Sequence, residues 1–380
     1  MKKFQPRGAA RPSAAAALRG VAALACLLVF AGCAQRTLDL GFIGDLTGKQ
    51  SELGVSGRDG ALLAVEQANA RREFGRTTFR LVAEDDRDSP DAFRSAVDAL
   101  VAEKVPAVVG PYTSAIAELA SAETRLLFVS PTASASSLAG RDDMLLRLMS
   151  SSSGGAEGLG RAAATEFHAA TAAILYDADN GLYARDFIAS FRSAYEAAGG
   201  KVVALRSYSS SDRSVQFAPL LEKLLAPRPA ALLVIATGFD TALVIRRAKQ
   251  LESGIRTLTS GWAATTDFLR YGGSAMDGTI FEQQFDPASR APAYLAFVAA
   301  YRSRFGSTPS FSSMYSYDAA FVLMRAMAKG ADSPRRIKQR ILAAPLVHGL
   351  QADYRLDAFG DVVRKNSLFV VRGDGYRALP

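Results

Sequence analysis

Short apolar runs alternate along the chain with longer stretches in which apolar residues recur at helical spacing. The first clear unit starts with the apolar run Leu38–Ile43, which leads into a loop rich in Gly, Ser and Thr. A stretch with Leu62, Val65 and Asn69 at helical spacing follows that loop. This pattern predicts a strand, a loop and a helix. In open α/β sheets, ligands bind beside loops at the carboxyl ends of strands, so Thr47 and Ser51 are placed where a polar small molecule binds.

The same alternation continues to residue 130. The run Pro106–Val109 is apolar without interruption, which is typical of a parallel strand buried on both faces. Because strands and helices alternate with short connections, we expect a doubly wound parallel sheet. The other strands are expected at 79–84 and 126–130, and the helices at 91–103 and 114–124.

A second series of the same kind follows the run Ser150–Gly155. That run is either a flexible linker or a hinge between two lobes, and the hinge is favoured because regular structure resumes on both sides. Strands are expected at 172–176, 202–207, 232–236 and 256–259, and helices at 158–168, 183–198 and from Gln216 and Asp240.

From Pro292 the pattern is mostly helical, and the end of the chain, 350–377, is expected to form short strands joined by turns. A helical block after the second lobe indicates that the chain returns to cover the first sheet. The expected divisions are a signal peptide at 1–32, lobe I at 37–152 plus 283–355, and lobe II at 153–282 plus 356–380. A cleft between the lobes follows from this division.

The first 32 residues have the composition of an export signal. Val21–Phe30 is an apolar run too short to span a bilayer as a helix of the mature protein. Phe30-Ala31-Gly32-Cys33 resembles a bacterial lipobox with Cys33 as the lipidated residue, although Phe30 replaces the usual Leu. The alternative is an ordinary signal peptide with a chance Cys. The basic residues before the apolar run are Lys2, Lys3, Arg7, Arg11 and Arg19.

Cysteine content and charge exclude several classes of function. Only Cys26 and Cys33 occur in the 380 residues, so the mature domain is expected to have neither a disulfide nor a reactive thiol. The formal charge of +8 includes five basic residues of the signal. The remaining 40 basic and 37 acidic residues are scattered, and no nucleic-acid-binding motif occurs, so no nucleic-acid partner is expected.

Catalytic, cofactor and metal motifs are not apparent. Gly44–Gln50 resembles a Walker loop but is one residue short between its glycines and has Gln50 in place of the magnesium-binding hydroxyl. His168 and His348 are far apart in the sequence and lie in apolar surroundings. The acidic run Glu84–Asp88 lacks the glycine and terminal Glu of a calcium loop and is expected to be solvated. We therefore expect no catalytic residue, no cofactor and no metal.

Hydroxyl groups follow two of the expected strands. Gly110–Ser114 follows the buried third strand and opens a helix, which Ser114 can cap, and Ser130–Ser134 repeats this arrangement after the next strand. The two segments are either simple helix caps or, as neighbours in one sheet, a site that binds one carboxylate through several charge-assisted hydrogen bonds. Their adjacency favours binding.

Several short segments resemble the leucine/isoleucine/valine-binding family of periplasmic solute-binding proteins. The similarity extends over Leu38 to about Phe369, and it is the order and spacing of the segments that make it specific. The segments are Asp59–Ala64, Val109–Ser114, Ser130–Ser134, Asp177–Tyr183 and Gly261–Ala263.

This resemblance implies two lobes joined by three crossovers that close on a small molecule, the type I periplasmic-binding-protein fold. It implies that Ser114, Ser134 and the backbone of Ala133 hold a carboxylate, with Leu53 against the ligand. From the second lobe it places Tyr183, Thr237 and Trp262 at ligand-facing positions.

Two of these residues depart from the amino-acid binders. Trp262 stands where that group has an acid for the ligand's ammonium, and Thr237 where it often has an aromatic residue. Asp240 or Asp179 can substitute for the missing acid, or each can be a helix cap. The resemblance implies a lipid-anchored extracytoplasmic protein that hands a small carboxylate to an ABC permease. The alternative is a non-transport sensor or envelope-enzyme scaffold on the same fold.

Overall fold

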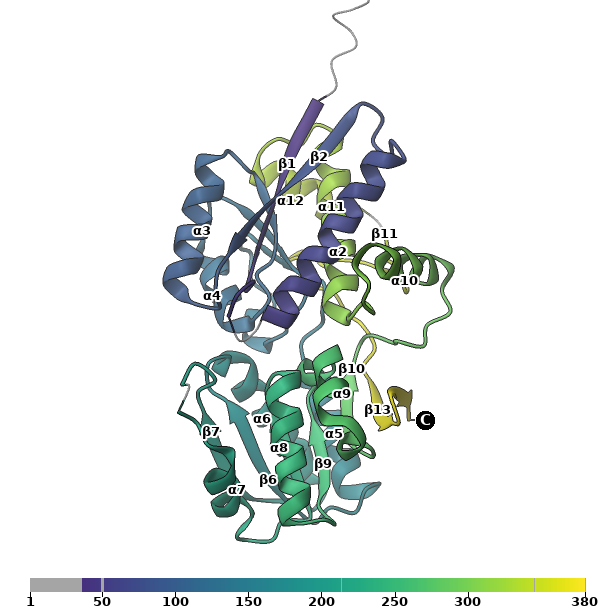
Figure 1. Ribbon diagram of the computed structural model, residues 1–380. Coiled ribbons are helices and arrows are strands. Elements are labelled where there is room, and N and C mark those ends of the chain that lie inside the picture. Colours follow the sequence, from purple (N-terminus) through teal and green to yellow (C-terminus); the bar gives the residue numbers. More distant parts are fainter. Residues whose placement is uncertain (1–35, 49–50, 213, 345, 380) are drawn as a thin grey trace, which may run out of the picture.

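The chain folds into two α/β lobes stacked along the long axis of the molecule (Figure 1). The structure is a computed structural model and describes residues 36–48, 51–212, 214–344 and 346–379. Each lobe is built on its own sheet, as the alternation of strands and helices predicts. In this part of the chain no helix is long and apolar enough to cross a bilayer.

The sheet of lobe I has five parallel strands in the order β2-β1-β3-β4-β5. Its strands are β1 (Arg36–Gly44), β2 (Thr77–Asp85), β3 (Ala107–Val109), β4 (Leu127–Ser130) and β5 (Leu145–Arg147). Alternate residues of β1 enter different cores, Phe42 on one face of the sheet and Ile43 on the other. Both faces are therefore covered, which explains why the inner strand β3 is apolar throughout.

Helices cover the first sheet on both faces. One face carries α2 (Ser51–Ala70) and α11 (Phe311–Ala328), and the other carries α3 (Pro90–Ala102) and α4 (Ser114–Ala122). Gly60 lets α2 approach α11, since a Cβ there would lie 2.0 Å from the carbonyl oxygen of Ser313. Lobe I is completed by the short helix η1 (Ser136–Leu138), α10 (Pro292–Phe305), α12 (Pro334–Leu342) and the pair β11 (Val347–His348) and β12 (Asp353–Tyr354).

The sheet of lobe II has seven strands in the order β14-β13-β10-β9-β8-β6-β7. Its strands are β6 (Thr171–Asp177), β7 (Lys201–Tyr208), β8 (Ala231–Ile235), β9 (Arg256–Thr259), β10 (Ile280–Gln283), β13 (Ser367–Arg372) and β14 (Gly375–Ala378). The first five are parallel, whereas the hairpin β13–β14 adds two antiparallel strands at one edge. This edge is a departure from the wholly parallel sheet that we expected.

The helices of lobe II also lie on both faces of their sheet. α5 (Ser153–Thr165) and α6 (Gly181–Ala197) pack on one face, and α7 (Phe217–Leu225) and α8 (Gly238–Leu251) pack on the other. The remaining elements are η2 (Gly261–Ala263), α9 (Thr266–Gly272) and η3 (Gly273–Met276).

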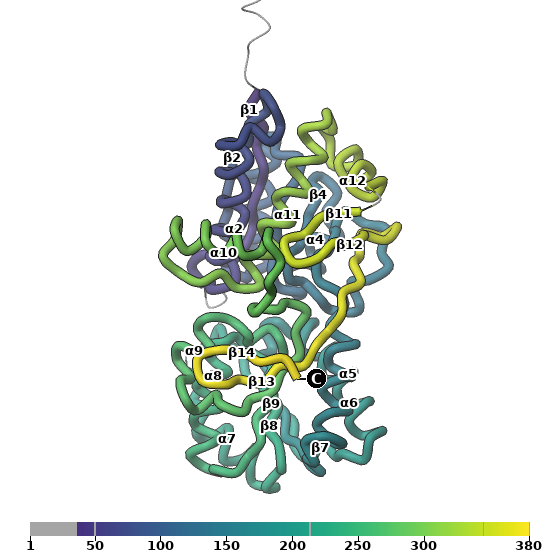
Figure 2. Tube along the Cα trace, turned by 90° about the vertical axis from the view of Figure 1, so that its right-hand side faces the viewer, coloured from purple at the N-terminus to yellow at the C-terminus, as the bar shows by residue number. Residues whose placement is uncertain are grey.

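Three segments connect the lobes, after β5, after β10 and before β13 (Figure 2). Hydrogen bonds join these segments to one another. The side chain of Gln284 accepts from the backbone N–H of Ser150 at 2.9 Å and donates to its carbonyl oxygen at 3.1 Å. Arg364 donates its backbone N–H to the Ser150 hydroxyl and its Nε to the carbonyl of Leu148 at 2.8 Å. The three crossovers therefore meet in one hydrogen-bonded junction.

The structure differs from the sequence-based expectations in several places. Helix α5 begins at Ser153, so the crossover uses only the first part of the Ser/Gly run. The strands β5 and β10 were not expected because each has only two consecutive apolar residues, and the helix α9 was not expected because it is only seven residues long. Asp86 in the acidic run is only 2% exposed, so the prediction of a solvated loop is wrong for that residue.

The expected lobe boundary at 356 remains a proposal. Residues just beyond it contact lobe I, because the backbone N–H of Arg147 in β5 donates to the carbonyl of Gly360 at 2.9 Å. The Arg147 guanidinium also pairs with Asp361.

Candidate functional site

A narrow cavity lies between the two lobes, beside the crossover junction. Lobe I contributes the carboxyl-end loops of its sheet and the start of α2, while lobe II contributes the starts of α5 and α6, η2 and the end of β10. Its walls are formed by Leu53, Tyr112, Ser114, Thr132, Ser134, Met149, Ser152, Asn180, Tyr183, Gly261, Trp262, Glu282, Gln284 and Phe311.

Five of the eight ligand-binding residues expected from the sequence line this cavity: Leu53, Ser114, Ser134, Tyr183 and Trp262. These five residues come from both lobes, so it is the fold that brings them together. Whether they bind a ligand remains a prediction.

The other three expected residues lie elsewhere. Thr237 and Asp240 line a neighbouring cavity, which shares Leu53 and Trp262 with the first. There Thr237 caps α8 by accepting from the N–H of Asp240 at 3.1 Å, and Asp240 accepts from the Tyr208 hydroxyl at 2.7 Å. Ala133 is buried, and its backbone N–H donates to the Ser130 hydroxyl at 3.1 Å.

Ser114 has its hydroxyl oxygen already engaged by two donors. It accepts from the backbone N–H of Ser134 at 3.2 Å and of Ala135 at 3.1 Å. A serine hydroxyl has two acceptor positions and one donor, so the remaining capacity of Ser114 is its O–H. Since the residue lines the cavity, it offers a hydrogen-bond donor and selects an acceptor as its partner.

The N-terminus of α4 lies at the same wall. Thr113, rather than Ser114 as expected, is the N-cap, and its hydroxyl accepts from the N–H of Ile116 at 3.4 Å. The backbone N–H of Ala115 donates to the side-chain oxygen of Asn180 in lobe II at 3.4 Å. The backbone N–H groups at this helix N-terminus favour a ligand group with a full or partial negative charge.

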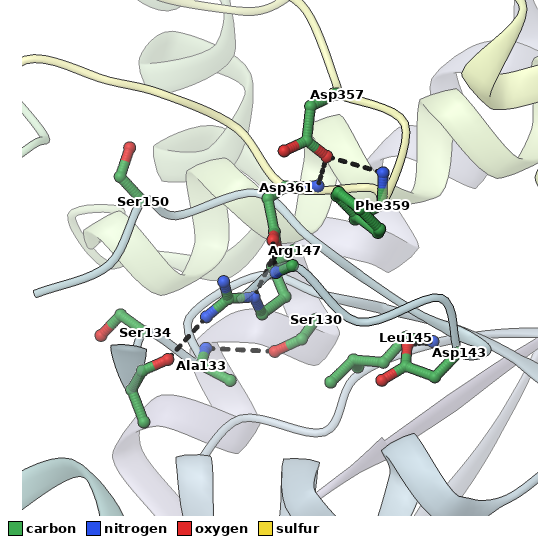
Figure 3. Close-up of polar contacts among 12 residues, drawn as sticks. Ser130, Ala133, Ser134, Asp143, Leu145, Arg147, Ser150, Asp357, Phe359 and Asp361 are labelled. Atoms are coloured by element: carbon green, nitrogen blue, oxygen red, sulfur yellow. Dashed lines mark hydrogen bonds and ion pairs between the residues drawn. The ribbon is translucent and has the colours of Figure 1, made fainter. Parts of the chain in front are cut away.

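A buried arginine supports the loop that carries Ala133 and Ser134 (Figure 3). Arg147 is only 1% exposed, pairs with Asp361 at 2.8 Å and donates to the carbonyl of Ala135 at 2.8 Å. The positive charge is therefore compensated by Asp361, while the second hydrogen bond holds the loop of the site in place.

On the lobe II wall, two buried polar groups have no hydrogen-bond partner among the described residues. These are the indole N–H of Trp262 and the hydroxyl of Ser152, which are 7% and 3% exposed. Tyr183 packs edge-on against Trp262 with ring centroids 5.7 Å apart. Because an unsatisfied buried polar group is costly, both groups are candidates for contact with a ligand.

Glu282, at the end of β10, is the one carboxylate among the described residues of the cavity wall, and the sequence analysis missed it. It accepts from the backbone N–H of Gly261 at 3.1 Å, and its burial raises its pKa to about 7. Glu282 stands between Phe281 and Gln283, and this local sequence gives no sign that its side chain reaches a cavity.

The two lobes also touch at two further places. The Glu52 carboxylate at the start of α2 accepts from the backbone N–H of Asp267 in α9 at 2.8 Å, and burial raises the pKa of Glu52 to about 7. Asp186 of α6 accepts from the Ser136 hydroxyl at 2.8 Å and the N–H of Ser137 at 3.1 Å. These contacts describe a closed arrangement of the lobes.

Catalytic and metal-binding features are limited in the described part of the chain. Within it, no group of three or more His, Cys, Asp or Glu side chains is arranged to hold a metal ion. None of the fourteen residues on the cavity wall is Lys, Arg or His. The cavity is therefore suited to binding a polar small molecule through hydroxyl groups, amides and one carboxylate.

Comparisons with known proteins agree with this geometry. The family model described as periplasmic binding protein matches residues 37–375. The chain is 26% identical over 275 residues to the Leu/Ile/Val-binding protein BraC3 of Rhizobium johnstonii, covering 71% of this chain and 74% of that protein.

Two solved structures are similar in fold. The branched-chain amino acid transporter substrate binding protein LivJ from Streptococcus pneumoniae, in complex with isoleucine, has a TM-score of 0.80 at 21% identity, covering 90% of this chain and 99% of that one. A solute binding protein of an ABC transporter from Rhodopseudomonas palustris, in complex with 3,4-dihydroxy benzoic acid, has a TM-score of 0.78 at 21% identity, covering 90% and 96%.

Proposed function

The chain belongs to the periplasmic binding protein family, and we propose that it is a lipid-anchored protein that binds a small carboxylate and delivers it to an ABC permease. The ligand is an amino acid or a related organic acid. The family implies an extracytoplasmic location. The relatives are substrate-binding proteins of transport rather than enzymes, so this chain binds its ligand without converting it.

The proposal that the ligand has a carboxylate rests on the hydrogen bonding of Ser114. Its acceptor positions are used by two backbone N–H groups, so it faces the cavity as a donor. The ligands named for two structural relatives, isoleucine and 3,4-dihydroxy benzoic acid, share a carboxylate. A few charge-assisted hydrogen bonds and one apolar contact suffice for micromolar affinity, which requires about 8 kcal/mol.

The proposed mechanism is closure of the lobes around the ligand. The crossover junction at Ser150, Gln284 and Arg364 is the place where the lobes hinge. Opening separates the contacts of Glu52 and Asp186 with the opposite lobe, and closing restores them. A ligand that contacts both walls binds the closed state more tightly and shifts the population toward it.

Binding can be followed by the fluorescence of Trp262, the single tryptophan of the chain. Its indole lies on the walls of both cavities, so we expect a saturable change in emission when a ligand fills the site. The measurement is a titration with amino acids and small organic acids, chosen by a thermal-shift screen of both classes. Compounds that stabilise the protein without changing the emission would contradict a ligand site beside Trp262.

The membrane anchor is tested separately, because Cys33 lies outside the described residues. Lipidation supplies about 0.8 kcal/mol for each buried CH₂ group. We expect Cys33→Ser to move the protein from the membrane to the soluble fraction after cell fractionation. Membrane association of the variant equal to that of the unaltered protein would show that Cys33 is not the anchor.

Delivery to a permease distinguishes transport from sensing. Loss of uptake of the radiolabelled ligand in a deletion strain supports transport, whereas normal uptake supports a sensor or scaffold.

A further inference from the structure

The cavity combines a donor on one wall with an acid on the other. Ser114 in lobe I offers an O–H, and Glu282 in lobe II offers a carboxylate. Among the described residues that line the cavity, Glu282 is the only Asp, Glu, Lys, Arg or His. A ligand with only negative charge would therefore meet an acid and no basic side chain.

We propose that Glu282 binds the ammonium group of the ligand and so selects an α-amino acid over a plain carboxylate. This inference rests on the proposed function and specifies its ligand class. In this role Glu282 replaces the acid whose expected position is occupied by Trp262.

The surroundings of Glu282 hold its carboxylate in a defined place. One oxygen, Oε1, accepts from the N–H of Gly261 at 3.1 Å. The other, Oε2, lies over Gly155 at the start of α5, where a Cβ would approach to 2.5 Å. The small residue at that position is thus required for the carboxylate to fit.

Aromatic rings border the same wall. Tyr183 and Trp262 line the cavity together with Glu282, and both are buried. The negative charge of Glu282 contributes to raising the pKa of Tyr183 well above its ordinary value, although burial is the larger cause. An ammonium beside these groups gains the charge of the carboxylate and the attraction of the ring faces.

Burial disfavours the charged form of Glu282 and raises its pKa to about 7. A bound ammonium reverses this effect, because an opposite charge nearby favours the ionised carboxylate. A bound carboxylate alone would oppose ionisation. The electrostatics of this wall therefore agree with a cationic ligand group.

The test compares each of the twenty amino acids with its deaminated carboxylate, and adds benzoate. Thermal shift identifies binders, and calorimetry gives their dissociation constants for the unaltered protein and for Glu282→Gln. We expect at least one amino acid to bind more tightly than its deaminated counterpart. Glu282→Gln, which keeps the side-chain shape, should weaken amino-acid binding by about tenfold or more and leave the carboxylate equal or tighter.

Glu157→Gln is the matched control, since Glu157 lies in α5 of the same lobe with its side chain 47% exposed. Glu157→Gln should change the dissociation constant of neither the amino acid nor its deaminated carboxylate. A general loss of folding in Glu282→Gln would weaken both ligand classes alike, so the ratio between the classes isolates the charge.

The outcomes separate this inference from the proposed function. Preferred binding of benzoate or another plain carboxylate would overturn the role of Glu282 and leave the proposed function in place. An unchanged preference of Glu282→Gln for amino acids over plain carboxylates would have the same consequence. Binding of neither class by the unaltered protein would overturn the proposed function itself.

Discussion

Replacement of Arg147 by methionine is expected to lower the free energy of unfolding by about 3–5 kcal/mol. Arg147 is 1% exposed and pairs with Asp361 at 2.8 Å, and Asp361 has a side chain only 15% exposed. Removal of the guanidinium leaves this carboxylate and the carbonyl of Ala135 without their partner. The carbonyl lies in the loop of the site, so ligand affinity should fall as well. Urea denaturation followed by circular dichroism measures the loss.

Arg125→Met is the control for this prediction. Arg125 pairs with Asp98 and Glu123 at 2.8 Å, but its side chain is 50% exposed. Exposed pairs contribute about 0–1 kcal/mol, so this variant should remain close to the unaltered protein. Equal losses in the two variants would show that burial of Arg147 is not the cause.

Replacement of Ser114 by alanine is expected to weaken ligand binding by about 1.5–3 kcal/mol, which corresponds to a dissociation constant roughly 10–150 times larger. The change removes the O–H that faces the cavity. It also leaves the N–H groups of Ser134 and Ala135 without their acceptor, so the loop of the site loses a support. Calorimetric titration with the carboxylate that binds most tightly in the screen gives the dissociation constants of the unaltered protein and of Ser114→Ala.

Ser121→Ala controls for the loss of a hydroxyl on the same helix. Ser121 lies in α4, and its hydroxyl donates to the carbonyl of Glu118 in an exposed position. This variant should bind as the unaltered protein does. If Ser114→Ala also bound with an unchanged constant, the carboxylate would have to contact a different part of the cavity wall.

The local pattern was sufficient to predict the type of fold and several residues of the cavity. Strands such as Ala107–Val109 are apolar because helices cover both faces of their sheet, and this condition is visible in the sequence. Ser114 and Ser134 lie five and four residues after the ends of β3 and β4. Parallel strands end at the same edge, so adjacency along the chain already places these residues together.

Partners that are distant in the sequence were not predictable in this way. Arg147 and Asp361 are 214 positions apart, and neither residue type nor spacing indicates that they meet. Asp240 was an expected replacement for the missing acid, but in the structure it accepts from Tyr208 beside the neighbouring cavity. Which acid faces which cavity depends on the packing of whole lobes.

The sequence by itself determined the two α/β lobes, the carboxyl-end loops and the hydroxyl groups on them, because strand, helix and turn preferences act over a few neighbouring residues. Only the tertiary structure decided that Glu282 shares a cavity with Ser114 and that Thr237 and Asp240 do not. The physical reason is that the cavity forms where two lobes close on each other. The orientation of each wall is set by crossover contacts, such as Gln284 with Ser150, that join residues more than a hundred positions apart.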